Sequence, residues 1–235
     1  MRLFYSLVCT IVLAGGPIIA QPLSYDPYYV LPAGPGQTSV DIGLTTVDAS
    51  DVFNTSDVVA MAKFNPHEKI EVGARFTFGW INDNISNFSS LVVGAKYSLG
   101  SNRAATANLT VPAGNVDDPG LSIGIMNTAA LAAGFDLNAQ FQLGLLKGYT
   151  GGKGIIVDAL IEPTMVFNDR FIGYLDVFIT SNTDSFSDFL AVNLGPNLDL
   201  GLSDGTVLNL GLTFGLSGDV KQAKTGLTAI LLRAM

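Results

Sequence analysis

The amino-acid sequence predicts an all-β fold: a closed, antiparallel, up-and-down transmembrane β-barrel of about twelve strands, with ten or fourteen as the alternatives. Charged residues make up only 14 % of the chain, against about 25 % in ordinary soluble domains. From residue 38 onward, apolar and polar side chains alternate in runs of about ten residues, the period of a strand with one apolar face. The gaps between these runs are alternately short and long, as expected where tight turns join the strands at one edge and longer loops at the other.

The first twenty residues are typical of a secretory signal peptide. Arg2 is followed by the largely apolar stretch Leu3–Ala14, and the small residue Ala20 stands at the expected cleavage point. The alternative is an uncleaved anchor, but the apolar run is shorter than the roughly 20 residues that a spanning helix needs. Residues 1–20 are therefore predicted to be removed.

Two further regions follow the signal peptide. Residues 21–36 are rich in Pro and Tyr and show no alternation. They are expected either to hang in the periplasm or to fold into the lumen as a partial plug. Residues 37–235 are expected to form the barrel.

Each strand is predicted from its own alternating run. In chain order the runs are Thr38–Val47, Asp57–Phe64, Lys69–Trp80, Leu91–Leu99, Ala104–Pro112, Leu121–Thr128, Phe135–Leu146, Ile155–Val166, Phe171–Thr180, Phe189–Leu202, Val207–Leu216 and Gly226–Met235. The third run is the clearest, because Val72, Ala74 and Phe76 share one face while Glu71, Gly73 and Arg75 share the other. The seventh and eleventh runs repeat this pattern.

The gaps separate into two classes. Short turns are predicted at Asn65–Glu68, Gly100–Arg103, Ala129–Gly134, Phe167–Arg170 and Ser203–Thr206. Longer loops are predicted at Asp48–Ser56, Ile81–Ser90, Ala113–Gly120, Lys147–Gly154, Ser181–Asp188 and Ser217–Thr225. This alternation predicts that all short turns lie at one end of the barrel.

A soluble β-sandwich is the main structural alternative. The apolar face of every predicted strand is nearly free of charge, and the exception, Arg233, stands at a chain end where its long side chain can reach an interface. Where one strand carries two charges, as with Asp158 and Glu162, both fall on the polar face. This uniformity favours a face that contacts lipid.

The aromatic residues favour the same interpretation, because amphipathic rings gather at the two headgroup levels of a membrane barrel. Phe64, Tyr97, Phe135 and Phe171 are predicted near the edge with the short turns, and Phe78, Trp80, Phe189 and Phe214 near the other edge. Phe76 and Phe141 fall between these two bands.

The segments Val92–Leu99 and Leu109–Gly114 resemble a hairpin of small outer-membrane transporters, including those associated with the MetA pathway of phenol degradation. In that family a Gly-Ala-Lys-Tyr-type strand precedes a Leu-Pro-Thr-Gly-type strand end. Val111 and Ala113 depart from the second pattern, and the chain ends on Met235, where such barrels usually carry an aromatic assembly signal. The resemblance implies a transport barrel in the outer membrane of a Gram-negative bacterium.

Several functional classes are excluded by composition. A net charge of −8 excludes a basic nucleic-acid binder, and one Cys with one His excludes a Cys/His zinc site. His67 falls in a predicted turn away from any nucleophile, and Asp158 and Glu162 are about 13 Å apart along a strand, too far for a glycosidase pair. The sequence therefore predicts neither an enzyme, nor a metal, nor a cofactor.

The polar face predicts a charged lumen with two unlike walls. Its charged residues are Lys63, Glu71, Arg75 and Lys96 on the second to fourth strands, and Asp136, Asp158, Glu162, Asp176 and Asp199 on the seventh to tenth. Opposed walls of this kind set up a transverse field that orders water and selects polar solutes. Apolar residues share the same face: Val92, Met126, Leu146, Ile156, Leu160, Ile172 and Phe178.

Two functions fit this pattern. The first is a narrow channel or transporter for small solutes across the outer membrane. The second is a non-conducting structural or adhesion-like barrel, whose lumen charges pair with one another and whose loops contact a partner. Both place the protein against outer-membrane lipid and lipopolysaccharide, require the barrel-assembly machinery, and involve no nucleic acid.

Overall fold

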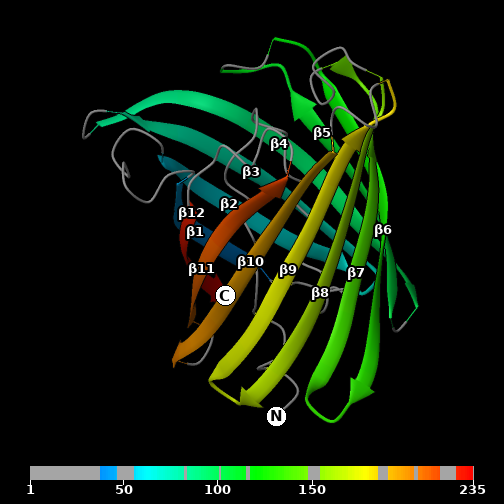
Figure 1. Ribbon diagram of the computed structural model, residues 1–235. Helices are drawn as coiled ribbons and strands as arrows, with labels where there is room; N and C mark the ends of the chain where they lie inside the picture. Colours follow the sequence, from blue (N-terminus) through cyan, green and yellow to red (C-terminus); the bar gives the residue numbers. More distant parts are fainter. Residues whose placement is uncertain are drawn as a thin grey trace.

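The computed structural model describes residues 38–46, 56–81, 84–100, 102–114, 117–147, 154–184, 190–203, 206–217 and 226–234. These residues form one closed barrel of twelve strands, in which every strand pairs antiparallel with its neighbours in the chain (Figure 1). The barrel closes where the first strand pairs with the last. The predicted all-β barrel is confirmed, with twelve strands rather than ten or fourteen.

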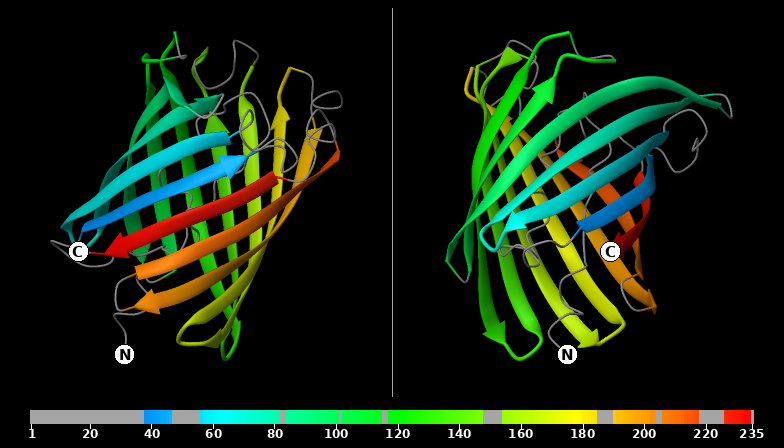
Figure 2. Two further views of the ribbon diagram at one scale, coloured as in Figure 1. Left: turned by 90° about the vertical axis from the view of Figure 1, so that its left-hand side faces the viewer. Right: turned by 180° about the vertical axis from the view of Figure 1, so that it is seen from behind.

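The strands are tilted steeply across the barrel wall, as the side and back views show (Figure 2). Their bounds are β1 Thr38–Thr46, β2 Ser56–His67, β3 Ile70–Ile81, β4 Asn84–Gly100, β5 Arg103–Val111, β6 Gly120–Ala132, β7 Phe135–Gly144, β8 Ile156–Asn168, β9 Phe171–Asn182, β10 Leu190–Ser203, β11 Thr206–Ser217 and β12 Gly226–Ala234. Each of the twelve predicted runs coincides with one of these strands.

The two faces of the wall differ in the way that the alternation predicts. Outward side chains include many exposed large apolar residues, such as Ile42, Phe141 and Leu231, at 57 %, 46 % and 46 % exposure. The residues between them point inward and are largely buried. Arg233 points outward near the end of β12 and donates a hydrogen bond to Thr206 Oγ1 (3.0 Å).

Short and long connections alternate along the chain, except that the connection between β3 and β4 is short where a long one is expected. Two residues separate β2 from β3, β4 from β5, β6 from β7, β8 from β9 and β10 from β11. The β6–β7 turn contains Gly134 at a φ of 74°, a conformation that Gly adopts without a Cβ clash. The predicted turn Ala129–Gly134 was too long, because β6 continues to Ala132.

The predicted loop Ile81–Ser90 is wrong. Here β3 and β4 run on as a paired hairpin in which Ile81 stands opposite Asn84. The pair extends beyond the barrel rim in Figure 1 and in the right-hand view of Figure 2. Register shifts near Phe78 interrupt the strict alternation, which hid the strand in the sequence. Phe88 of this hairpin packs against two aromatic rings of β3. Its ring centroid lies 6.4 Å from that of Phe76 and 5.6 Å from that of Phe78.

Within the described residues, no helix is long and apolar enough to cross a membrane. The predicted signal peptide at 1–20 and the Pro/Tyr-rich segment at 21–36 lie outside the described part of the chain.

Candidate functional site

The inner wall of the barrel carries all nine charged residues that the polar face predicted. Arg75, Lys96, Asp158, Glu162, Asp176 and Asp199 are buried at inward-facing positions, and Lys63, Glu71 and Asp136 are half-buried there. Since the barrel contains twelve strands in sequential order, β2–β4 stand opposite β8–β10. The two groups of charges therefore face each other across the lumen.

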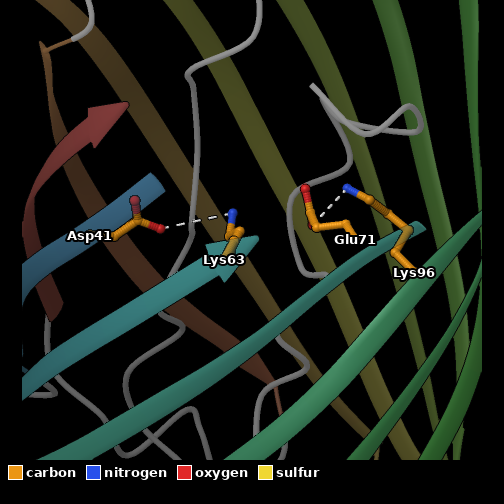
Figure 3. Close-up of polar contacts among 4 residues, drawn as sticks. All are labelled: Asp41, Lys63, Glu71 and Lys96. Carbon is orange, nitrogen blue, oxygen red and sulfur yellow. Dashed lines mark ion pairs between the residues drawn. The ribbon is translucent and has the colours of Figure 1, made fainter. Parts of the chain in front are cut away.

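The wall formed by β1–β4 combines bases with acids. Lys63 Nζ lies 3.8 Å from Asp41 Oδ2, and Lys96 Nζ lies 3.1 Å from Glu71 Oε1 (Figure 3). Glu71 and Lys96 are directly opposed in the β3–β4 register, and unlike charges at such a position attract. Asp57 lies within electrostatic reach of Arg75.

These pairs revise the predicted transverse field. The basic residues of β2–β4 are accompanied by as many inward-facing acids, because Asp41 and Asp57 join Glu71 on this wall. Opposite charges in close contact cancel at longer distance. The β1–β4 wall is therefore close to neutral, and the asymmetry of the lumen comes from the acidic wall alone.

A small pocket opens beside these pairs. It is lined by Lys63, Glu71, Gly73, Gly94 and Lys96 and has an empty volume of about 180 Å³ that includes space open to solvent. The backbone approaches closely here: a Cβ on Gly73 would lie 2.9 Å from the carbonyl oxygen of Ala62. Gly73 and Gly94 therefore line the pocket at positions where a Cβ would force a neighbouring atom to shift.

The wall formed by β7–β10 is acidic and rich in amides. Glu162 Oε1 accepts hydrogen bonds from Asn138 Nδ2 (3.0 Å) and Thr164 Oγ1 (2.9 Å), and Asn138 in turn accepts one from Thr128 Oγ1 (2.7 Å). Asp176 Oδ2 accepts one from Asn197 Nδ2 (2.5 Å). The carboxyl groups of Glu162 and Asp176 are also within hydrogen-bonding contact of each other. These residues form a continuous polar belt from β6 to β10.

A second group extends this belt to β11. Asn209 Nδ2 donates to Asp199 Oδ1 (2.7 Å) and to the hydroxyl oxygen of Tyr174 (2.5 Å). The Tyr174 hydroxyl lies 3.5 Å from Asp199 Oδ1, at the limit of a hydrogen bond. The acids of this wall are thus held by amides and hydroxyls.

Asn138 is the central donor of the polar belt, and we expect Asn138→Leu to destabilise the barrel by about 1–3 kcal/mol. The change removes a donor from the buried carboxylate of Glu162 and the acceptor of Thr128. Urea unfolding in detergent micelles measures the effect. The matched variant Asn127→Leu removes an exposed bond from Arg103 and should change stability by less than about 0.5 kcal/mol. Equal losses in both variants would contradict a stabilising role for the belt.

Apolar side chains fill part of the lumen between the charges. Leu160, Ile172, Val207 and Ile230 belong to one buried cluster, against which Phe178 packs. Met126 packs with Ala104, Val92 is fully buried and Ile156 is 4 % exposed. Leu146 was wrongly predicted to point inward: β7 ends at Gly144, so Leu146 leaves the alternation and is 45 % exposed.

The aromatic residues predicted at the membrane edges lie near strand ends. Phe64, Tyr97 and Phe171 are exposed near the short turns, and Phe135 is half-buried there. At the other end Phe214 is 36 % exposed and Phe78 is half-buried against Phe88. Phe189 and the side chain of Trp80 lie outside the described part of the chain.

Some residues of the site were not singled out from the sequence. Asp57 and Tyr174 point inward. Each lies an even number of positions from a charged residue on the polar face of its own strand, Asp57 from Lys63 and Tyr174 from Asp176, so the alternation alone identifies them. His67, which was excluded as a catalytic residue, sits at the β2–β3 turn, where its Nδ1 accepts a hydrogen bond from the Lys69 amide (3.2 Å).

Two of the longer loops are tied together outside the lumen. Lys147 Nζ lies 2.6 Å from Asp118 Oδ2, which joins the β5–β6 loop to the β7–β8 loop. The hydrogen bond that Lys147 donates to Asp118, together with the negative charge of Asp118, raises the pKa of Lys147.

Solved structures share this fold at low sequence identity. The KdgM porin matches with a TM-score of 0.61 at 8 % identity, over 83 % of this chain and 98 % of that one. The COG4313 outer membrane channel from Pseudomonas putida F1 matches with a TM-score of 0.61 at 14 % identity, over 95 % and 100 %. LpxR from Salmonella typhimurium matches with a TM-score of 0.53 at 7 % identity, over 83 % and 99 %.

No family model matches the sequence, and a search of curated proteins found no match. At these identities the structural likeness shows the fold alone.

Proposed function

We propose that this protein is a narrow channel for small polar solutes in the outer membrane of a Gram-negative bacterium. One observation supports this most strongly: the barrel is apolar outside and charged inside on the same strands. Ile161 and Glu162 are neighbours in β8, yet one is 45 % exposed on the outer face and the other is 1 % exposed in the lumen. A soluble barrel has the reverse pattern.

A closed sheet with an apolar outer face is suited to a lipid bilayer. In a bilayer every backbone N–H and C=O group must be paired within the protein, and a closed sheet provides this without free edges. The exposed apolar side chains contact acyl chains at no cost in hydration. The aromatic residues near the strand ends then lie at the headgroup level, and Arg233 reaches the interface.

The strand number supports a narrow pore. Eight-stranded barrels are filled by side chains, whereas those of sixteen or more leave an aqueous channel. Twelve strands fall between these sizes, and the apolar cluster around Leu160 and Ile172 narrows the available space further. Small solutes and ions are therefore the expected cargo.

The comparisons favour the same function. Among the similar structures are a porin and an outer-membrane channel, and the KdgM porin was also solved in complex with disordered oligogalacturonate. The predicted signal peptide, cleaved after Ala20, provides the export step. The hairpin of β4 and β5, which contains Val92–Leu99 and Leu109–Gly114, adds a proposed relationship to the transporters associated with the MetA pathway.

We expect the purified, folded protein to produce stepwise conductance in planar lipid bilayers. The lumen provides charged and amide groups that replace part of the hydration of a passing solute. The same protein unfolded by heat before addition is the control, because it has lost the closed lumen. Folded protein that inserts into the bilayer without conducting would contradict the proposed function.

A non-conducting barrel is the second candidate, and the ion pairs Lys63–Asp41 and Lys96–Glu71 favour it. Paired charges are what a packed lumen with a purely structural role contains. Insertion without conductance would favour this candidate, and its partner contacts would then come from the longer loops.

A further inference from the structure

The acidic wall points to the class of solute that the proposed channel accepts: we infer that the lumen favours small positively charged solutes over negatively charged ones. This inference rests on the proposed function and adds the solute class to it. Its evidence is the distribution of charge, the unpartnered oxygen atoms of the acidic wall, and the contact between two buried carboxyl groups.

Acidic and basic side chains are unequally distributed around the lumen. On β7–β10 the inward-facing charged residues are all acids, and the described part of these four strands contributes no inward-facing Lys or Arg. These acids are Asp136, Asp158, Glu162, Asp176 and Asp199. The bases of β2–β4 are matched in number by Asp41, Asp57 and Glu71 on their own wall. Even with one proton shared between Glu162 and Asp176, the described part of the lumen wall carries more acids than bases, and low-dielectric walls concentrate the effect of this negative charge on passing ions.

The acidic wall also contains buried acceptor oxygen atoms that lack a donor. Buried oxygen atoms on β7–β10 that receive no hydrogen bond within the described structure include Gln140 Oε1 and Asn193 Oδ1. Their side chains are no more than 6 % exposed. Gln140 and Asn193 are neutral amides, so this shortage of donors is independent of the acidic charge. A buried acceptor without a donor is costly, and an ammonium group or a hydrated cation provides the missing donor or charge.

Glu162 and Asp176 bring two buried carboxyl groups into contact on the acidic wall. Two buried carboxyl groups in hydrogen-bonding contact share a proton, because two carboxylates this close would repel strongly. No described Lys or Arg forms an ion pair with either of them, since their other partners are Asn138, Thr164 and Asn197. A cation beside the pair takes the place of the shared proton and neutralises the second carboxylate. A cation passing along β8 and β9 is therefore attracted at this point, and an anion is repelled.

The double variant Glu162→Gln, Asp176→Asn tests the inference. Each replacement keeps the shape and one acceptor oxygen, and the new amides donate to each other in place of the carboxyl contact. Reversal potentials are measured in bilayers across a KCl gradient at or below about 0.1 M, where the screening length is about 10 Å or longer. We expect the native channel to prefer K⁺ over Cl⁻, and the permeability ratio to fall at least about two-fold in the double variant.

Two controls make the result specific. The matched variant Glu68→Gln, Asp169→Asn makes the same two substitutions in turns outside the lumen and should leave the permeability ratio unchanged. Glu71→Gln leaves Lys96 without its acidic partner and should also lower the ratio, because it adds net positive charge to the lumen. Gel mobility before and after heating establishes that each variant is folded.

Swelling of protein-containing liposomes extends the test to organic solutes. Free lysine should enter faster than free glutamate through the native channel, and this difference should shrink in the double variant. A conducting protein that prefers Cl⁻, or a ratio that is the same in the native protein and the double variant, overturns the inference but leaves the channel function standing. Folded protein that does not conduct overturns the proposed function and the inference with it.

Discussion

Ile161→Arg should destabilise the folded barrel by about 2–4 kcal/mol in lipid vesicles, because it places a charge near the bilayer midplane. Ile161 lies near the middle of β8, points outward and is 45 % exposed. Its cross-strand neighbours are Ala139 and Val177, neither of which offers a counter-charge. A guanidinium group at this depth must lose hydration or bend away along the strand, and both are costly.

Urea-dependent unfolding in vesicles measures this loss, with tryptophan fluorescence as the readout. Leu131→Arg is the matched control: Leu131 is also outward and exposed, but it lies at the end of β6 beside the turn. At that interface level the same substitution should cost only about 0–1 kcal/mol.

The comparison of the two Arg variants decides whether the outer face contacts lipid. A charge on the water-exposed surface of a soluble barrel changes stability little at either position. Equal and small losses for Ile161→Arg and Leu131→Arg would therefore contradict the membrane-spanning arrangement, whatever the channel measurements show.

Gly43→Val should destabilise the closure of the barrel by about 1–3 kcal/mol, the range typical of overpacking. Gly43 stands opposite Ile230 where β1 pairs with β12. A Cβ at this position would lie 2.9 Å from both the carbonyl oxygen of Ala229 and the Cα of Ile230, and would also meet the Ile230 side chain. Since two of these atoms belong to the backbone, the strands must move apart to relieve the contact.

Thermal unfolding followed by gel mobility detects this loss, because the closed barrel and the unfolded chain migrate differently. Gly100→Val is the matched control, since a Cβ on Gly100 would have no neighbour within 4 Å. A Gly43→Val variant as stable as Gly100→Val would show that the closing strands can separate without cost.

The strands of the barrel were predictable because each carries its own signal. On β7, Asp136, Asn138 and Gln140 alternate with Leu137 and Ala139, and this local pattern fixes both the conformation and the face that points inward. The same alternation assigns Glu162 on β8 and Asp176 on β9 to the face that points inward.

The β3–β4 extension was not predictable from this signal. Its two strands shift register near Phe78, and a shift exchanges the faces of the residues that follow. Polar residues such as Asn84 then interrupt the pattern, although the hairpin remains paired and Phe88 packs against Phe76 and Phe78. Pairing between strands compensates for a sequence that resembles a loop.

The sequence by itself determined that this chain forms a barrel, because alternation, charge depletion and the rhythm of turns and loops are properties of consecutive residues. Only the tertiary structure decided how the lumen charges are arranged. Lys96 and Glu71 are 25 positions apart in the chain, and their contact at 3.1 Å depends on the β3–β4 register. The contact between Glu162 and Asp176 likewise depends on how β8 and β9 are paired. The alternation along a strand assigns each side chain to a face, but register and closure decide which charges meet, and so which of the lumen charges are paired.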